Sequence, residues 1–454
     1  MNKAGSHAKV QHEAVAPVPP TLRQAFWFWL RLGFISFGGP AGQIAIMHHN
    51  LVEQKRWISE KRFLHALNYC MVLPGPEATQ LATFIGWLMH RTWGGIVAGG
   101  LFVLPSFFIL CGLAWIYMAY GAVPAIAGAL YGIKPAVVAI VLFAAWRIGS
   151  RVLRNWLLWA IAALAFVAIF GFKLPFPVIV LTAGVAGYFG GRISPDYFKT
   201  GGGHKAALKL FGAAVIDDDT PAPSHALFSW CRLAKTTAAG LTIWLAATLI
   251  LVAIFGWSNT FTQMGWFFSK AALLTFGGAY AVLPYVYQGA VENYHWLTPV
   301  QMIDGLALGE TTPGPLIMVV TFVGFVGGWA KEVLGANAVF ASAFIAAAIT
   351  TFFTFLPSFM FILMGGPFIE TTHGNLKLTA SLTAITAAVV GVIVNLAVFF
   401  AYHVFWPTGL ENAADWLPVV LAVGALAAVA RFGIGVISVI LACGAVGMAW
   451  RLFN

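Results

Sequence analysis

A Pro-Gly-Pro motif occurs twice in the chain, at residues 74–76 and 313–315. Prolines on both sides of a glycine interrupt a helix, because proline lacks a backbone donor and pushes the preceding residue toward extended geometry. The helices that begin after the motifs, at Glu77 and Leu316, should therefore present free backbone N–H groups. Such a helix end attracts anions, so the motifs predict paired anion sites, with a simple interhelical turn as the alternative.

A Phe-Gly-Gly motif precedes each Pro-Gly-Pro, at residues 37–39 and 276–278, and predicts a second break in the chain. Both motifs recur 239 residues later (276 − 37 and 313 − 74). The repeat extends to Leu-Pro-Ser-Phe at residues 104–107 and 356–359, which indicates a gene duplication. A lone glycine pair in a membrane helix indicates close packing, whereas paired breaks in two halves are typical of a transporter's ligand site.

Two cations lie inside apolar segments and are related by the same repeat. Arg31 and Lys270 each precede the phenylalanine of their motif by six residues. Charged side chains in membrane spans usually face a cavity or a partner, although a long cation near a helix end can reach the interface instead. Because both halves carry one, we expect the pair to supply positive charge to the site. Lys134 aligns with Ile385 and is either a ligand contact or a loop-end residue.

Acidic residues are few, and two of them lie beside the Pro-Gly-Pro motifs. Glu77 follows the first motif directly and Glu310 precedes the second by three residues. Glu77 can cap the helix that begins there, and either carboxylate is a candidate proton carrier. His65 aligns with Asp304, which is a weak hint. The sequence contains no metal-ligand spacing, P-loop, nucleophile elbow or dinucleotide fingerprint, so we expect no metal, no cofactor and no enzymatic activity.

The composition is that of a membrane protein. The 454 residues are 60% hydrophobic and only 9% charged, and their mean hydropathy is +0.85. A soluble chain would carry about a quarter charged residues. The net charge of +10 does not form one basic stripe, so a nucleic-acid partner is not expected. The four cysteines show no CxxC spacing, which argues against a disulfide framework or a zinc site.

The apolar segments predict an all-α polytopic membrane protein, with about thirteen transmembrane helices in two homologous halves that contain broken helices. Residues 1–22 lack the apolar core of a signal peptide, so the first membrane helix should target the chain. The predicted parts are a cytoplasmic polar tail (1–23), a first repeat (24–191), a cytoplasmic linker (192–235), an unmatched helix (236–257) and a second repeat (258–454). The expected spans lie at about 24–46, 70–90, 95–119, 124–147, 156–172 and 176–191, then 236–257, then 262–285, 312–330, 335–364, 379–402, 416–430 and 433–450.

The distribution of Lys and Arg predicts the orientation of the two halves. Basic residues gather in the linker and after the fourth span, at Arg147, Arg151 and Arg154. If both regions are cytoplasmic, the N-terminus is inside, the unmatched helix inverts the second half, and the C-terminus is periplasmic. The basic loop, residues 55–62, argues against this orientation because it would lie outside. The conflict eases if this loop folds back into the protein.

These motifs resemble those of the chromate ion transporter family in its long, two-domain form. The resemblance covers nearly all of the chain outside the tail and the linker, and it is carried by RLGFISFGGP (31–40), VLPGPEATQLA (72–82), GIKPAVVAIV (132–141), SKAALLTFGGAYAVLPY (269–285) and TTPGPLIM (311–318). It implies export of chromate across the bacterial inner membrane, with sulfate as a related oxyanion, and thirteen spans in oppositely oriented halves. The second copy has Ala279 where the first has Pro40, and it lacks counterparts of Glu77 and Gln80, so the halves should do unequal work.

We therefore predict a secondary active transporter that confers chromate resistance by efflux, as an antiporter, through a site near the bilayer midplane. A sulfate transporter of the same build and a passive anion channel are alternatives, while a chromate reductase is not favoured. The driving force is open, and a homodimer is an alternative to a monomer. The predicted substrate-binding residues are Arg31, Ser36, Gly38, Gly39, Gln43, Pro74, Gly75, Pro76, Glu77, Gln80, Lys134, Lys270, Gly277, Gly278, Pro313, Gly314 and Pro315, and the candidate proton carriers are Glu77 and Glu310.

Overall fold

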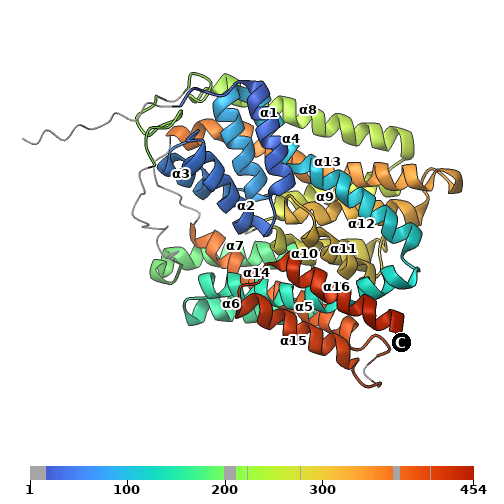
Figure 1. Cartoon of the computed structure of the whole chain (residues 1–454). Helices are drawn as coiled ribbons and strands as arrows, with labels where there is room; N and C mark the ends of the chain where they lie inside the picture. Colours follow the sequence, from blue (N-terminus) through green and yellow to red (C-terminus); the bar gives the residue numbers. More distant parts are fainter. Residues whose placement is uncertain are drawn as a thin grey trace, which may run out of the picture.

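The computed structural model describes residues 17–198, 211–221, 223–276, 278–371, 379–409 and 411–453. Every regular element in these ranges is a helix, and one isolated parallel bridge joins Ile58 to Ile216 (Figure 1). Among the described residues, seven helices are long and apolar enough to cross a membrane, and three shorter helices are also apolar. This confirms the predicted all-α polytopic membrane fold.

The α-helices of the two halves follow in matching order on either side of α8 (Trp230–Phe255), except that one long helix of the first half corresponds to two helices of the second and the short 3-10 helices differ. The first half consists of α1 (Leu22–Ile35), α2 (Gly39–His48), η1 (His49–Gln54), α3 (Glu60–Cys70), α4 (Glu77–Tyr120), α5 (Pro124–Val152), α6 (Trp156–Phe170), α7 (Phe176–Ile193) and η2 (Pro195–Phe198). The second half consists of α9 (Thr260–Leu274), α10 (Ala279–Tyr287), η3 (Gln288–Asn293), α11 (Pro299–Thr311), η4 (Leu316–Met318), α12 (Val319–Lys331), η5 (Ala336–Ala338), α13 (Val339–Thr371), α14 (Thr379–Phe405), α15 (Trp416–Ala430) and α16 (Val436–Phe453).

Both glycine motifs break the helices that contain them. The expected span 24–46 is divided into α1 and α2, and Gly38 adopts a left-handed conformation (φ +88°) at the start of α2. The expected span 262–285 is divided in the same way into α9 and α10. Gly277 lies outside the described residues. After the Pro-Gly-Pro motifs, α4 begins at Glu77 and η4 begins at Leu316, as the prolines predict.

The long element α4 is a hairpin of two helices. His90 and Arg91 leave the helical conformation, and Arg91 has φ +56°. A Cβ atom on Gly99 would lie 2.2 Å from the hydroxyl of Thr83. In a straight helix these residues would be about 24 Å apart, so the two arms must pack side by side. The expected spans 70–90 and 95–119 correspond to these arms, and α12 and α13 form the matching pair in the second half.

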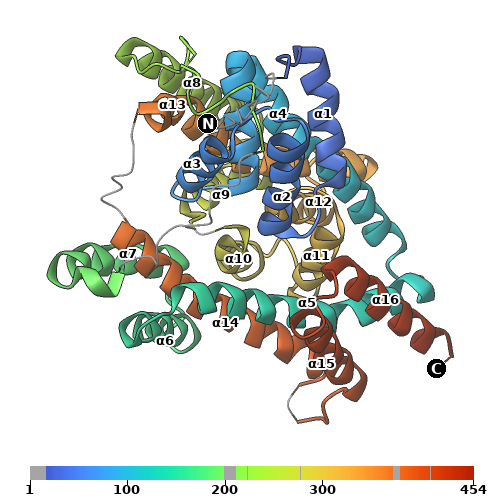
Figure 2. The ribbon, with the colours of Figure 1, turned by 60° about the vertical axis from the view of Figure 1, so that its left-hand side comes forward.

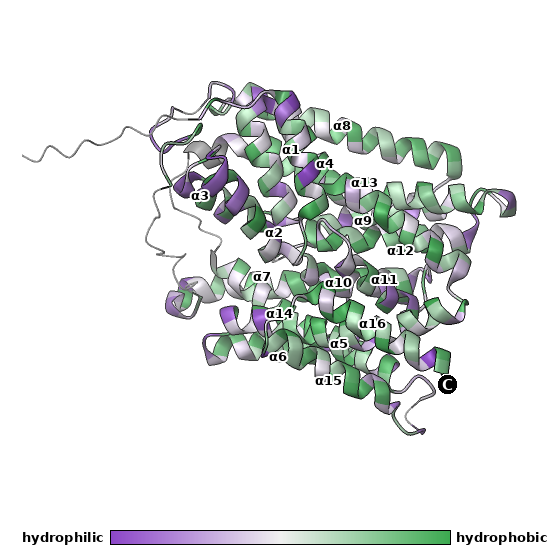
Figure 3. Ribbon diagram, viewed as in Figure 1, coloured by the Kyte–Doolittle hydropathy of each residue, from purple (hydrophilic) through white to green (hydrophobic). Residues whose placement is uncertain are grey.

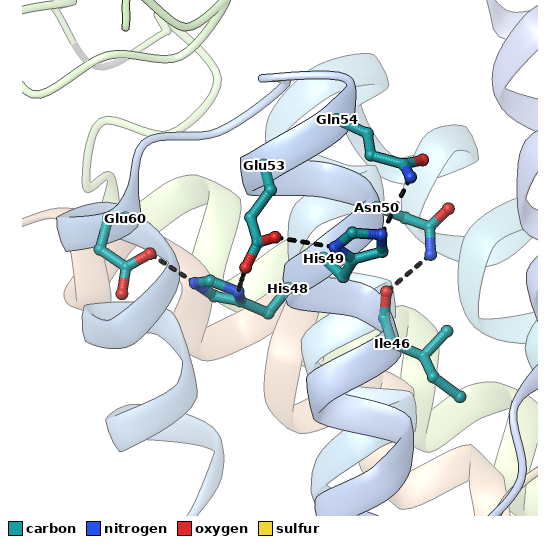
Figure 4. A network of polar contacts seen from close by, with 7 residues as sticks. All are labelled: Ile46, His48, His49, Asn50, Glu53, Gln54 and Glu60. Carbon is teal, nitrogen blue, oxygen red and sulfur yellow. Dashed lines mark hydrogen bonds and ion pairs between the residues drawn. The ribbon is translucent and has the colours of Figure 1, made fainter. Parts of the chain in front are cut away.

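The chain also turns back between α1 and α3. The ring of Trp57, which follows η1, lies 4.6 Å from the ring of Phe28 in the first half of α1. The chain therefore passes inward along α1, breaks at residues 36–38, and returns along α2 and η1. The returning end is held by a network shown in Figure 4, in which His48 lies between Glu53, at 3.2 Å, and Glu60. His49 contacts the same Glu53 carboxylate at 2.8 Å, and this hydrogen bond lowers the pKa of Glu53.

The return of the chain brings the basic loop against the linker. The amide of Ser59 donates to the carbonyl oxygen of Ile216 over 3.0 Å, and the Ser59 hydroxyl donates to Asp218 over 2.6 Å. Arg62 donates to the carbonyl oxygen of Thr220. The loop thus folds back onto the side of the molecule that carries the linker, which we call the linker side. A loop that folds back in this way was the condition under which its positive charge is compatible with a cytoplasmic linker.

The last two helices of each half pack against a helix of the other half. The pair α6 and α7 of the first half packs on α14 of the second, and the pair α15 and α16 packs on α5 of the first (Figure 2). Small residues let these backbones touch, because a Cβ atom on Gly132 would lie 2.0 Å from the carbonyl oxygen of Cys443. A Cβ atom on Gly391 would lie 1.9 Å from that of Ala162. Each half therefore completes the packing of the other.

The helix α8, on the outside of the molecule, is apolar along most of its length (Figure 3). Within α8 the side chains of Leu249, Ile250 and Ile254 are exposed, and Gly240 is its buried residue. A helix that is apolar all round and exposed requires an apolar solvent. The exposed face of α8 is therefore suited to the lipid bilayer.

Candidate anion-binding site

The two Pro-Gly-Pro turns are each attached to the broken helix of the opposite half. The amide of Gly75 donates to the carbonyl oxygen of Thr275 over 2.8 Å, and the amide of Gly314 donates to that of Ser36 over 2.7 Å. Ser36 and Thr275 directly precede the Phe-Gly-Gly motifs, and both are fully buried. The four glycine motifs, which are far apart in the chain, thus form two contacts between the halves, and we call the region of these contacts the junction.

Two glutamines of the first half strengthen this junction. Gln43 in α2 donates its side-chain amide to the carbonyl oxygen of Gly314, and Gln80 in α4 donates to the carbonyl oxygen of Pro74 over 2.8 Å. The side-chain oxygens of both glutamines are buried and have no hydrogen-bond partner among the described residues. The junction is therefore polar, and its hydrogen bonding is incomplete.

Two serines that the site prediction missed lie directly against the turns. A Cβ atom on Gly75 would lie 2.3 Å from the Ser358 hydroxyl, and one on Gly314 would lie 2.9 Å from Cβ of Ser106. Both serine hydroxyls are buried and have no partner among the described residues. An unpaired buried hydroxyl costs free energy, so each is available to a ligand. The Leu-Pro-Ser-Phe repeat was the sequence signal for these positions.

The first turn of α4 faces the break of the second half. A Cβ atom on Gly278 would lie 3.9 Å from Oε1 of Glu77, the first residue of α4. Two residues further on, within the same turn, the hydroxyl of Thr79 is buried without a partner among the described residues. The amides of this turn have no preceding helical carbonyls to bind, which leaves donors at the junction. The predicted residues Gly38, Pro74, Pro76, Pro313 and Pro315 lie within the same breaks, and Gly39 begins α2.

The two predicted cations lie on the helices that lead to the junction. Arg31 is exposed on α1, one turn before that helix ends. Lys270 is partly buried on α9, with its amine 5.7 Å from the ring centre of Trp266. Neither side chain makes a hydrogen bond or an ion pair with a described residue. Both charges are therefore uncompensated by acids.

Lys134 and Glu310 are each bound to a residue of the second half. The amine of Lys134 in α5 lies 3.6 Å from a carboxylate oxygen of Asp304 in α11. Glu310 is buried at the end of α11 and accepts a hydrogen bond from the hydroxyl of Tyr280 in α10. Lys134 is thus paired with an acid rather than placed in a loop. Among the described residues, no group of three His, Cys, Asp or Glu side chains is arranged to hold a metal ion.

Two surface hollows lie at the outer ends of α1 and α9, away from the junction. Their volumes are about 250 Å³ and about 180 Å³. They occupy equivalent positions of the two halves, since Gln24 and Lys55 line the first where Gln263 and Tyr294 line the second. The duplication therefore repeats a surface hollow at the outer end of each broken-helix pair. Of the two hollows, the first is lined by a cation, Lys55, and the second is not.

Comparison with known proteins identifies the family. The family model described as "Chromate transporter" matches residues 23–188 and again residues 262–448. The chain is 31% identical over 383 residues to a chromate transport protein of Cupriavidus metallidurans, which covers 84% of this chain and 83% of the relative. It is 33% identical over 383 residues to a chromate transport protein of Pseudomonas aeruginosa, covering 84% of this chain and 81% of the relative. No solved structure matches the chain. A double match to one family model, on a fold whose two halves have their α-helices in matching order, establishes that this chain belongs to the chromate transporter family.

Proposed function

We propose that the chain exports chromate across the inner membrane by secondary active transport, and so confers chromate resistance. The relatives named above are chromate transport proteins, which suggests the substrate. The observation that supports the location of the site is the reciprocal pair of hydrogen bonds from Gly75 to Thr275 and from Gly314 to Ser36. These bonds hold both interrupted helices of each half at one junction, where a ligand can contact both halves.

Chromate at this junction would be held by hydrogen-bond donors. A tetrahedral dianion presents four acceptor oxygens and no donor, so it needs N–H and O–H groups around it. The unpaired hydroxyls of Ser106 and Ser358 and the free amides at the start of α4 are such groups. The positive end of the helix dipole adds to their effect. Sulfate has the same shape and charge, so it is the competing substrate that any assay must include.

Arg31 and Lys270 would provide the positive potential that draws the dianion to the junction. Neither is neutralised by an acidic side chain among the described residues, and each lies on the helix that leads to a break. In an apolar medium an uncompensated cation acts over a longer range than in water. Because one cation lies in each half, we propose that the anion passes from one to the other as the halves move.

We propose that the linker side is cytoplasmic and that the two halves have inverted topology. The basic loop, the linker and the ends of α5 and α7 carry about half of the cations, and the first two lie against each other. Positive charge is retained in the cytoplasm. The single helix α8 then places the surface hollow at the outer end of α9 on the periplasmic side. Rocking of the halves about the junction would open the site to each side in turn.

The test is uptake of radiolabelled chromate into inverted membrane vesicles. We expect saturable uptake that excess sulfate reduces, and a loss of at least tenfold in R31A and in K270A with normal membrane insertion. K331A, which removes an exposed cation from the end of α12, is the matched control and should transport normally. Near-normal transport by both R31A and K270A would refute the electrostatic role. Flux that follows the anion gradient without saturation would favour a channel.

A further inference from the structure

An ion pair within the membrane region joins the two halves away from the glycine motifs. Lys134 lies on α5 of the first half and Asp304 on α11 of the second, and the amine is 3.6 Å from carboxylate oxygen Oδ1. Tyr117, near the end of α4, donates to the other oxygen, Oδ2, over 3.0 Å. Three helices from both halves therefore meet at one carboxylate.

The hydrogen bonding of the Asp304 carboxylate is incomplete. Asp304 is 2% exposed, and its Oδ1 accepts no hydrogen bond from a described residue. The distance to Lys134 is longer than a hydrogen bond between an ammonium and a carboxylate, which is about 2.7–2.9 Å. The side chain of Lys134 is 24% exposed. The acid is thus closed off, whereas the amine is open to an approaching group.

Burial leaves few ways to balance the charge of this carboxylate. Lys134 from α5 and Tyr117 from α4 are the titratable groups that contact it, and among the described residues no ion pair or hydrogen bond reaches it from α12, α14 or α16. Removing the partner of a buried charge is strongly destabilising, because the charge left behind is uncompensated. When Lys134 turns to another anion, Asp304 must therefore take up a proton, and Oδ1 is the oxygen free to receive it.

The pair is absent from the symmetric position of the fold. The repeat aligns Asp304 with His65 and Lys134 with Ile385, which is buried. A contact required only to build the scaffold would be expected in both halves, because the other elements occur in both. The asymmetry instead suits a group that acts once in each transport cycle.

We propose that Asp304 is the proton acceptor that couples transport to the proton gradient, with Lys134 as the switch between its carboxylate and the transported oxyanion. When the oxyanion pairs with the Lys134 amine, a proton binds Oδ1 of Asp304, so that both new charges are balanced. When the anion leaves, Lys134 returns to Asp304 and the proton is released on the same side, so each dianion moves together with one proton. The outward movement of the remaining single negative charge is driven by the interior-negative membrane potential. This inference rests on the proposed oxyanion transport and adds its coupling residue to Glu77 and Glu310, which the sequence suggested.

The experiment compares D304N with wild type in proteoliposomes, with the membrane potential clamped and a pH gradient imposed or absent. Asparagine keeps the size and the acceptor for Tyr117 but cannot take up a proton. We expect D304N to exchange chromate for chromate within a factor of about three of wild type. We also expect the stimulation of chromate uptake by a pH gradient that is acidic outside, seen in wild type, to be lost. D415N is the matched control, because Asp415 also accepts from a tyrosine, Tyr131, at 2.5 Å but forms no ion pair with a lysine among the residues that the structure describes. It should respond to the gradient as wild type does.

The possible results separate the two proposals. Full stimulation of D304N by the pH gradient would overturn the coupling role, and so would a wild type that transports chromate without any response to pH. Absence of chromate transport in wild type would overturn the proposed function itself. If D304N fails to fold because Lys134 is left unpaired, the double variant D304N/K134Q removes both charges. Because this variant also lacks the lysine that pairs with the oxyanion, its chromate exchange should be weaker, and the exchange that remains should show no gradient stimulation. Retained stimulation would exclude the role of the pair.

Discussion

The amide of Gly75 donates a hydrogen bond to the carbonyl oxygen of Thr275 over 2.8 Å, across the boundary between the two halves. Its counterpart in the repeat is the bond of 2.7 Å from Gly314 to Ser36. Each bond satisfies a carbonyl that the broken helix leaves without a helical donor. The two breaks are therefore stabilised by each other, which explains why both motifs occur in both halves.

Alanine at Gly75 should disrupt this junction. Gly75 has φ +128° and its Cβ would lie 2.3 Å from the Ser358 hydroxyl, so alanine adds both a clash and backbone strain of about 1–3 kcal/mol. We expect G75A to lower the melting temperature and to reduce chromate transport at least tenfold. G100A is the control, because a Cβ there meets no atom within 4 Å. Equal stability and transport in both variants would contradict the role of this turn.

The serine hydroxyls should contribute to binding of the anion. Loss of one hydrogen bond to a charged group costs about 1.5–3 kcal/mol, so S106A and S358A should each weaken chromate binding about tenfold or more. Equilibrium binding to purified protein measures this directly. S150A, which changes an exposed serine bonded to the Arg147 carbonyl, should bind as wild type does. Unchanged affinity in both S106A and S358A would place the anion elsewhere.

The natural cysteine at position 231 reports the orientation of the linker. Cys231 is exposed, whereas Cys70, Cys111 and Cys443 are buried. A membrane-impermeant maleimide should therefore label Cys231 in inverted vesicles and not in right-side-out cells. In the C231S background, E411C should show the opposite pattern, because Glu411 lies in the exposed loop between α14 and α15. Labelling of Cys231 from outside the cell would reverse the proposed topology.

The attachment of the linker to α4 should weaken in acid. His225 contacts the carbonyl oxygen of Trp87 at 3.0 Å, and burial lowers the pKa of His225 from its usual 6.5, with Arg91 and Arg232 adding to the effect. The undocked linker binds a proton more readily than the docked one. The docked state therefore has its full stability above about pH 6.5 and loses it as the pH falls below that value.

Hydrogen exchange in residues 223–229, corrected for intrinsic rates, measures this change. Protection should fall between pH 7.5 and pH 5.5 in wild type. H225Q retains a donor for the Trp87 carbonyl but cannot be protonated, so its protection should be nearly constant over this range. The same fall in H225Q would assign the pH dependence to another group.

Much of the local structure follows from the sequence because proline and glycine act on their immediate neighbours. The breaks at residues 36–38 and the helix starts at Glu77 and Leu316 were predicted from the motifs alone. The duplication and the all-helical membrane fold were equally visible, since a repeat of spacing and an excess of apolar residues are properties of the chain. The hairpin in α4 appeared only as two expected spans.

The partners of these elements were decided by tertiary structure. The repeat alone did not reveal that Gly75 would meet Thr275, that the Ser106 and Ser358 hydroxyls would lie against the turns, or that Lys134 would pair with Asp304. Such contacts depend on how all the helices pack, because each joins residues far apart in the chain. The charge pattern left the position of the basic loop open, and only the tertiary structure shows that it packs against Ile216 and Asp218. The chain thus determines by itself where its helices break, because backbone restriction is local, whereas packing decides which breaks face each other and which charges remain free.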